Sequence, residues 1–184
     1  MITDNIRKIL FGVLAVGLLA VLFKFVWDQE QILKKGKDFN FKIEPFDPSD
    51  PFRGKYLNIR FSEDHLNYVD NANDFQVGET VIAILKQDDL FAKVIDLQKT
   101  PPLSTQDYIY VKIKRIEDTN IVYFEFPFSK YFFEESKSDT LAKIFQTTLQ
   151  NPNTKNYAIV TVKDGKGVMK DIYLDNQPIQ SFFK

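Results

Sequence analysis

The hydrophobic pattern divides the chain into two unequal parts. Residues 9–27 form an almost uninterrupted apolar run, in which Lys24 is the only charged residue. A helix rises about 1.5 Å per residue and the hydrocarbon core of a bilayer is roughly 30 Å thick, so a run of this length just spans it. We therefore predict a transmembrane helix over residues 9–27, with residues 1–8 as a cytoplasmic head and residues 28–38 as a juxtamembrane linker. The lipid bilayer is thus the first partner that the sequence predicts.

The end of the apolar run carries two residues that suit a membrane interface. Lys24 lies one turn before the end, so its aliphatic stem can lie in lipid while its ammonium group reaches the headgroups. Trp27 suits the aromatic belt of the same interface. The alternative is a cleaved signal peptide, because Arg7 and Lys8 form a short basic segment before the run. The bulky residues at 23–27 offer no small-residue cleavage site, which favours an uncleaved anchor.

Basic residues flank the apolar run on both sides, so a simple count of Lys and Arg leaves its orientation ambiguous. Arg7 and Lys8 precede the run, whereas Lys34, Lys35 and Lys37 follow it at a greater distance. A short head before the first apolar segment usually stays inside. We therefore predict a single-pass protein of the cytoplasmic membrane, with its domain on the extracytoplasmic side.

Beyond the anchor, apolar and polar residues alternate or form short apolar runs, patterns that are typical of β-strands. Turn-forming residues such as Asp88-Asp89 and Asp164-Gly165 separate several of these segments, which indicates hairpins. Eight segments have this character, at residues 39–43, 57–61, 80–86, 90–97, 108–116, 121–126, 157–162 and 168–174.

One later segment breaks the strand pattern. Apolar residues recur at helical spacing between Leu141 and Leu149, with Ser138 or Asp139 as the N-cap. The predicted fold class is therefore mainly β (α+β). A transmembrane helix is followed by one antiparallel domain over residues 39–184, with about eight strands and one short helix.

Composition narrows the chemistry of this domain. The formal net charge is -1, so no basic surplus attracts nucleic acid. The absence of cysteine excludes disulfides, thiolate zinc sites and cysteine nucleophiles. The single histidine, His65, lies in a polar stretch, and we interpret it as a solvated loop residue. No cofactor is predicted.

The densest chemistry lies in a proline-rich loop before the second predicted strand. Two Asp-Pro steps keep the residues before each proline extended, and Asp47 and Asp50 can each bond a downstream amide. Arg53 can then bridge the two carboxylates, and Gly54 permits a positive φ or a bulge before the strand.

This segment resembles a family of bacterial membrane-anchored proteins named for a Gly-Asp-Tyr-x-x-Leu-x-Tyr motif. Residues 54–61 read GKYLNIRF, in which Gly54 and Tyr56 match the motif and Ile59 and Phe61 are similar in kind. Their alternation places them in the second predicted strand.

The resemblance extends beyond the motif itself. Lys55 stands where the family has an acid, which reverses the charge at that position. Residues 47–53 (DPSDPFR) are similar to the family's Asp-Pro-x-Asp-Pro-x-Arg lead-in, and residues 131–143 and 172–179 are weaker matches. The resemblance implies a membrane protein that is associated with multi-pass membrane proteins, and it implies no known catalytic activity.

The function predicted from these observations is that of a membrane-anchored extracytoplasmic module of unknown biochemical activity. It would bind or support a membrane or envelope partner, with a multi-pass membrane protein as the candidate. The competing interpretation is that the proline loop only shapes a turn. The residues predicted for binding are Asp47, Asp50, Arg53, Gly54 and Tyr56, followed by Ile59 and Phe61 in the motif strand.

A membrane-bound hydrolase of the serine–lysine type is one alternative function. The pairs Ser129-Lys130 and Ser136-Lys137 supply the residue types. A dyad needs the amine beside the hydroxyl in space, whereas adjacent residues of a strand point to opposite faces. The thin catalytic inventory favours binding over catalysis.

Two further alternatives involve ligands. Paired aspartates, Asp47 with Asp50 or Asp70 with Asp74, could hold Ca²⁺, although neither pair has EF-hand spacing. A dense set of aromatic residues could form either core or an apolar pocket or patch. Its members are Phe124, Phe126, Phe128, Tyr131, Phe132 and Phe133.

Overall fold

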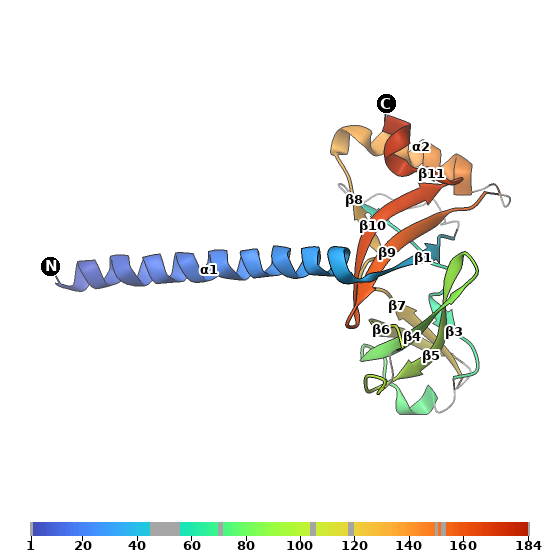
Figure 1. Ribbon diagram of the computed structural model, residues 1–184, viewed down its shortest axis with the longest axis horizontal. Helices are drawn as coiled ribbons and strands as arrows, with labels where there is room; N and C mark the ends of the chain where they lie inside the picture. The colour runs from blue at the N-terminus through green and yellow to red at the C-terminus, as the bar shows by residue number, and fades with distance from the viewer. Residues whose placement is uncertain are drawn as a thin grey trace.

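A computed structural model describes residues 2–44, 56–69, 72–103, 106–117, 120–149, 151 and 154–183. The chain begins with one long helix, α1 (Ile2–Lys35), which projects from a β-rich domain (Figure 1). The segment Ile6–Lys35 is long and apolar enough to cross a membrane, and its most apolar window is not buried against the domain. The described residues therefore contain one candidate membrane span, near the N-terminus, as a single-pass anchor requires.

The anchor helix joins the domain through a single residue. α1 ends at Lys35, Gly36 follows, and strand β1 (Lys37–Lys42) begins at once. A Cβ atom at Gly36 would lie 2.7 Å from the carbonyl oxygen of Ile32 and 2.8 Å from that of Val162. Only glycine therefore permits this close approach. The segment predicted as a linker, residues 28–38, is the end of α1 and the start of β1; the domain boundaries themselves stay a prediction.

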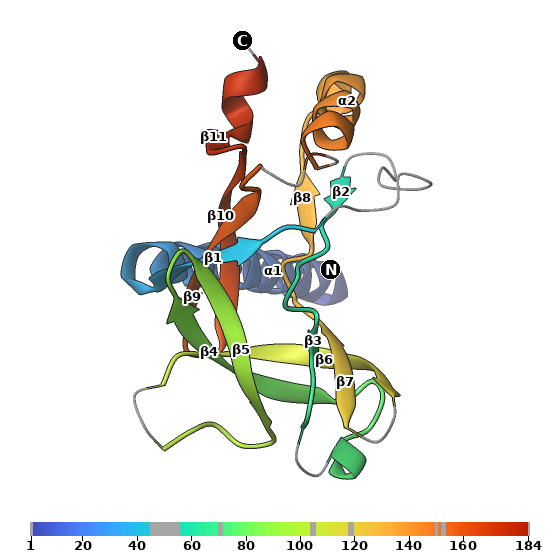
Figure 2. The same cartoon turned by 90° about the vertical axis from the view of Figure 1, so that its right-hand side faces the viewer.

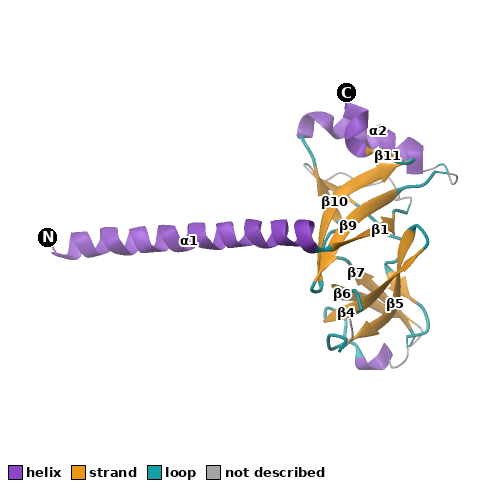
Figure 3. Cartoon of the chain, viewed as in Figure 1, coloured by secondary structure: helices purple, strands orange, loops and turns teal. Residues whose placement is uncertain are grey.

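The described part of the domain is built from three antiparallel sheets (Figure 3). A four-stranded sheet has the order β1-β9-β10-β11, a five-stranded sheet has the order β3-β7-β6-β4-β5, and β2 pairs with β8. Figure 2 shows the five-stranded sheet at one end and the β9–β10 arm with α2 at the other. The remaining strands are β2 (Tyr56–Asn58), β3 (His65–Leu66), β4 (Thr80–Asp88), β5 (Phe91–Gln98), β6 (Tyr108–Glu117), β7 (Ile121–Glu125), β8 (Lys130–Phe132), β9 (Tyr157–Lys163), β10 (Lys166–Leu174) and β11 (Gln177–Pro178).

Helical segments are few in the described domain. The α-helix α2 (Ser138–Leu149) covers one end, with Leu141 and Phe145 buried. Three short 3-10 helices complete the structure: η1 (Ala72–Asp74), η2 (Glu135–Lys137) and η3 (Ile179–Phe183). The predicted fold class, an N-terminal apolar helix followed by an antiparallel β-rich domain, is confirmed.

Two local predictions differ from the structure. The second predicted strand, residues 57–61, is regular only over Tyr56–Asn58, because Ile59 donates its amide to the Ser129 carbonyl and Phe61 forms an isolated bridge with Ile43. The interpretation of His65 as a solvated loop residue is wrong. It lies in β3, half-buried, and its ring stacks on Tyr123 with the centroids 5.3 Å apart.

One apolar core joins the sheets. Phe41 of β1 packs against Phe61, Phe126 and Phe128, with ring centroids 5.7, 5.1 and 5.2 Å away. All four side chains are buried. The phenylalanines therefore tie the four-stranded sheet to the segment that leads into β3 and the segment that follows β7, two neighbouring strands of the five-stranded sheet.

A charged cluster links β1 to β9 and β10 close to the helix junction. The buried Thr161 hydroxyl donates to Asp38 Oδ1 at 2.6 Å, and Lys170 Nζ donates to Asp38 Oδ2 at 2.8 Å. Partial burial pushes the pKa of Asp38 upward, but the hydrogen bonds from Lys170 and Thr161 outweigh it and leave that pKa below its ordinary value.

Asp38→Asn is expected to reduce the free energy of unfolding at pH 7 by about 0.5–1 kcal/mol, because the carboxylate is 44% exposed and solvent screens its ion pair. A carboxyl whose folded pKa is depressed stabilises the fold above its unfolded pKa of about 3.9 and loses that effect as the pH falls through the folded value. Denaturation curves of the wild type and the variant in detergent micelles should therefore converge in acid.

Asp175→Asn is the matched control for this experiment, since that aspartate is exposed and its replacement should leave stability unchanged at either pH. If the difference in the free energy of unfolding between the wild type and Asp38→Asn stayed constant down to pH 2, the ionised Asp38 carboxylate would not be the stabilising group.

Candidate functional site

The structure describes three of the seven residues predicted for binding. Asp47, Asp50, Arg53 and Gly54 lie outside the described residues, so their role stays a prediction. Among the others, Tyr56 is half-buried in β2, whereas Ile59 and Phe61 are buried in the core.

Tyr56 forms part of a small aromatic and cationic surface on β2 and β8. Its ring centroid lies 5.7 Å from that of Phe132, and the Lys130 ammonium lies 4.9 Å from the centre of the Tyr56 ring. A cation over a tyrosine face is attracted by the ring quadrupole. The motif tyrosine therefore positions two exposed side chains of β8.

The motif strand also lines a surface cavity of about 370 Å³, which we call the motif cleft. Leu57, Ile59 and Phe61 are the buried members of the alternation, and Arg60 is exposed. The cleft is lined by Asn58, Ile59, Arg60, Phe61, Asp64, Lys114, Phe124, Glu125, Phe126 and Ser129.

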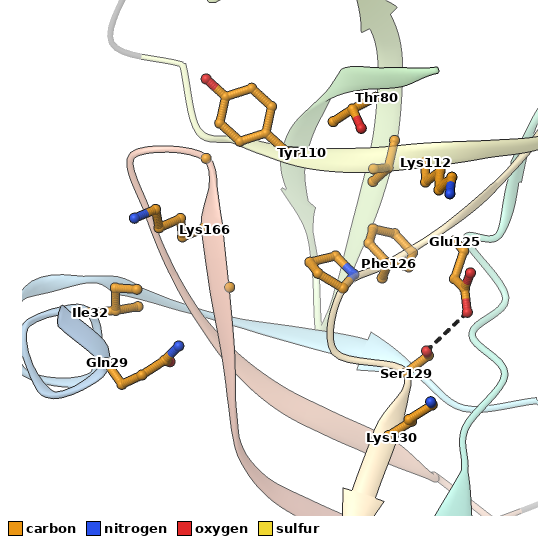
Figure 4. Close-up of a pocket in the computed structure, with 14 residues that line it drawn as sticks. Gln29, Ile32, Thr80, Tyr110, Lys112, Glu125, Phe126, Ser129, Lys130 and Lys166 are labelled. Atoms are coloured by element: carbon orange, nitrogen blue, oxygen red, sulfur yellow. Dashed lines mark hydrogen bonds between the residues drawn. The ribbon is translucent and has the colours of Figure 1, made fainter. Parts of the chain in front are cut away.

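A second, larger cavity of about 620 Å³ lies beside the end of the anchor, and we call it the α1 cleft (Figure 4). α1 supplies Gln29 and Ile32, and the tip of the β9–β10 hairpin supplies Lys166. The other lining residues are Thr80, Tyr110, Val111, Lys112, Glu125, Phe126, Pro127, Ser129, Lys130, Gly165 and Gly167.

The two clefts adjoin, because Glu125, Phe126 and Ser129 line both of them. These residues lie at the end of β7 and in the turn that leads to β8. Two adjoining clefts therefore lie between the end of α1 and the motif strand.

The two carboxylates that line these clefts are paired with neighbouring side chains. Ser129 Oγ donates to Glu125 Oε1 at 3.4 Å, and Lys114 Nζ lies 2.5 Å from Glu125 Oε2. In the motif cleft, Arg60 Nε lies 3.6 Å from Asp64 Oδ2. Such exposed pairs orient side chains and contribute little to stability.

The described geometry gives neither proposed serine–lysine pair the contact that a dyad requires. The Ser129 hydroxyl bonds Glu125, while the Lys130 ammonium lies over Tyr56. Lys137 lies 3.4 Å from the Glu134 carboxylate in an ion pair. A nucleophilic serine needs a base within hydrogen-bond reach, and neither lysine occupies that place.

The proposed Ca²⁺ sites gain no support from the described chain. Asp47, Asp50 and Asp70 lie outside it, and its described residues contain no group of three acidic, histidine or cysteine side chains suited to a metal ion.

The aromatic set divides between core and surface. Phe124, Phe126 and Phe128 are buried, whereas Phe132 is 69% exposed. Tyr131, Phe132 and Phe133 line a shallow cavity of about 430 Å³, together with Glu134, Lys137 and Gln180. Burial raises the pKa of the Tyr131 phenol above its ordinary value, with a further contribution from the Asp171 charge.

The two residues predicted for the membrane interface lie on one helix. Lys24 Nζ pairs with Asp28 Oδ2 at 2.8 Å, one turn further along α1, and Trp27 is exposed between them. Their placement at the interface stays a prediction.

Sequence reasoning missed the lysines around the α1 cleft. Lys112, Lys130 and Lys166 come from three strands far apart in the chain, and each follows an ordinary pattern of exposed strand positions. The one local signal was Asp164-Gly165, which correctly predicts the tight hairpin turn that carries Lys166.

Comparison with known proteins gives one finding. The family model described as GDYXXLXY protein matches residues 18–172, which include the end of the apolar run, the motif strand and most of the β-rich domain. No curated protein and no solved structure matches the chain.

Proposed function

The chain belongs to the GDYXXLXY protein family, and we propose that it is a membrane-anchored module that binds a multi-pass membrane protein. The observation that carries the proposal is the pair of adjoining clefts between the end of α1 and the motif strand. A partner that spans the same bilayer would reach this surface without leaving the membrane plane.

The side of the membrane is part of the proposal. Arg7 and Lys8 precede the apolar segment, and a short basic head favours retention in the cytoplasm. The domain would then work on the extracytoplasmic face of the cytoplasmic membrane. The proline loop with Asp47, Asp50 and Arg53 precedes the motif strand in the chain and would extend the binding surface.

The chemistry of the two clefts favours binding over catalysis. Their carboxylates, Asp64 and Glu125, are held by Arg60 and Lys114, and Ser129 donates to the paired Glu125 carboxylate. Charged side chains that line a surface depression, with apolar residues such as Phe126 at its base, fit recognition of a protein segment.

The cysteine-free chain allows one experiment to test both the side and the partner. Asn58→Cys in the motif cleft would be labelled in spheroplasts with a membrane-impermeant maleimide that carries a photoreactive group. We expect labelling from outside, followed by a light-dependent crosslink to a multi-pass membrane protein identified by mass spectrometry.

Lys155→Cys is the matched control, since Lys155 is exposed and lies outside both clefts. It should be labelled equally and should not crosslink the same partner. Labelling of neither position would refute the extracytoplasmic placement. Crosslinking of the same protein from both positions, or of none from Asn58→Cys, would refute the binding surface.

A further inference from the structure

The rim of the α1 cleft carries three lysines that have no ion-pair partner among the described residues. Lys112, Lys130 and Lys166 are exposed, and none of them forms an ion pair with a described residue. The one carboxylate that lines the cleft, Glu125, is already paired with Lys114. The whole chain has a formal net charge of -1, so this concentration of ammonium groups is local.

The cleft lies close to where the bilayer surface must be. The apolar run ends at Trp27, and Gln29 and Ile32 on the following two turns of α1 line the cleft. Lys166 lies near enough to act electrostatically on the Asp28 carboxylate. A cationic hairpin tip therefore lies beside the first residues that follow the apolar run.

Helix geometry fixes the height of the cleft. Eight residues, Asp28 to Lys35, separate the apolar run from the end of α1, and they rise about 12 Å at 1.5 Å per residue. The polar layer on each side of a bilayer is about 5–8 Å thick, the difference between the full and hydrocarbon thicknesses. The cleft thus opens at the outer edge of the headgroup layer.

An exposed aromatic residue continues this surface along β8. Lys130 and Phe132 are two residues apart and share one face of the strand, both in contact with Tyr56. Since Lys130 lines the cleft with α1, this face of β8 is on the anchor's side. Basic and aromatic side chains together are typical of surfaces that rest on a membrane interface.

We propose that the α1 cleft binds the headgroup of an anionic phospholipid from the bilayer that holds α1. Lys166, on the side of α1, would contact the phosphate, Lys112 and Lys130 on the other side of the cleft would add to its positive field, and the buried Phe126 would face the glycerol end of the lipid. A lipid phosphate is the anion that the membrane itself presents at this height. The inference is independent of any protein partner.

The test uses the full-length protein in uncharged detergent micelles and dioctanoyl phosphatidylglycerol as the probe. Native mass spectrometry counts the lipids retained per chain during a titration. Each lysine near an anionic lipid surface contributes about fivefold to binding. Lys112→Gln with Lys166→Gln is therefore expected to weaken retention about 25-fold.

Two control variants separate site charge from overall charge and from folding. Lys42→Gln with Lys155→Gln removes the same charge from exposed positions outside the cleft and should retain the lipid. Lys112→Arg with Lys166→Arg keeps the charge and should also retain it. Unchanged circular dichroism of each variant confirms that the fold is intact.

Three results would overturn the proposal. If dioctanoyl phosphatidylcholine were retained as well as dioctanoyl phosphatidylglycerol, the negative charge of the lipid would not contribute to binding. If Lys42→Gln with Lys155→Gln weakened lipid retention as much as Lys112→Gln with Lys166→Gln, the α1 cleft would not be the binding site. Binding of inorganic phosphate without retention of phosphatidylglycerol would assign the site to a soluble anion.

Discussion

Replacing Phe41 by alanine is expected to lower the free energy of unfolding by about 3–5 kcal/mol. The Phe41 side chain is 0% exposed and lies within 5.7 Å, centroid to centroid, of three other phenylalanine rings. The substitution removes the apolar surface of one ring, leaves a cavity and breaks three aromatic contacts. Because domains are stable by only about 5–15 kcal/mol, a large share of the fold's stability depends on this residue.

The measurement is chemical denaturation of the full-length protein in detergent micelles, followed by the circular dichroism of the β-rich domain. Phe132→Ala is the matched control, since Phe132 is 69% exposed and its loss should cost less than about 1 kcal/mol. If Phe41→Ala and Phe132→Ala lowered the free energy of unfolding equally, Phe41 would not be a core residue.

Gly165→Ala is expected to destabilise the protein by about 2–5 kcal/mol. Gly165 has φ +77° in a two-residue turn, and a left-handed conformation costs an alanine about 1–2 kcal/mol. An added Cβ would also overlap the Tyr110 ring and come within 2.6 Å of the Tyr108 ring. Overpacking of this kind costs about 1–3 kcal/mol.

The rings cannot move freely, because the turn is fixed to β6. The Tyr110 amide donates to the Gly165 carbonyl at 2.9 Å, and Ile109 forms a bridge with the same glycine. The substitution should therefore detach the hairpin tip from β6 and open the wall of the α1 cleft that carries Lys166.

Gly78→Ala provides the comparison for this second prediction. Gly78 also has a positive φ, +87°, but an added Cβ would meet nothing within 4 Å. It should show the backbone cost alone, about 1–2 kcal/mol in the same denaturation experiment. If Gly165→Ala and Gly78→Ala lowered the free energy of unfolding equally, the crowding between the hairpin tip and the tyrosine rings would not contribute to the destabilisation.

Patterns that depend on neighbouring residues were predictable from the sequence. The apolar run predicts α1, the patterns over residues 108–116 and 121–126 predict the β6–β7 hairpin, and Asp164-Gly165 predicts the tight turn of the β9–β10 hairpin. Each signal lies in one continuous segment, where side-chain period and turn chemistry act directly on the backbone.

Features that depend on distant residues were not predictable. β3 contains only two residues, His65 and Leu66, which is too short to show a period, and its pairing with β7 draws the histidine into the sheet. The α1 cleft brings together Gln29, Lys112 and Lys166 from segments that the sequence separates widely. No local pattern encodes such a juxtaposition.

The motif illustrates both cases. Alternation correctly indicates that Ile59 and Phe61 share one face, and the structure buries both of them. The contact of Tyr56 with Lys130 and Phe132 required knowledge of the pairing between β2 and β8, two strands of three residues each.

The single-residue junction at Gly36 fixes the rotational orientation of the domain around the axis of α1, as well as the distance of the domain from the apolar run. Because only Gly36 separates α1 from β1, the α1 cleft faces a single direction around the helix axis. Each residue inserted into the end of the helix would turn the domain by about 100° while raising it only 1.5 Å. A neighbouring protein in the bilayer would thus contact either the cleft or the opposite side of the domain, according to which face of the membrane helix it packs against. The anchor helix itself therefore determines which surface of the domain such a protein reaches.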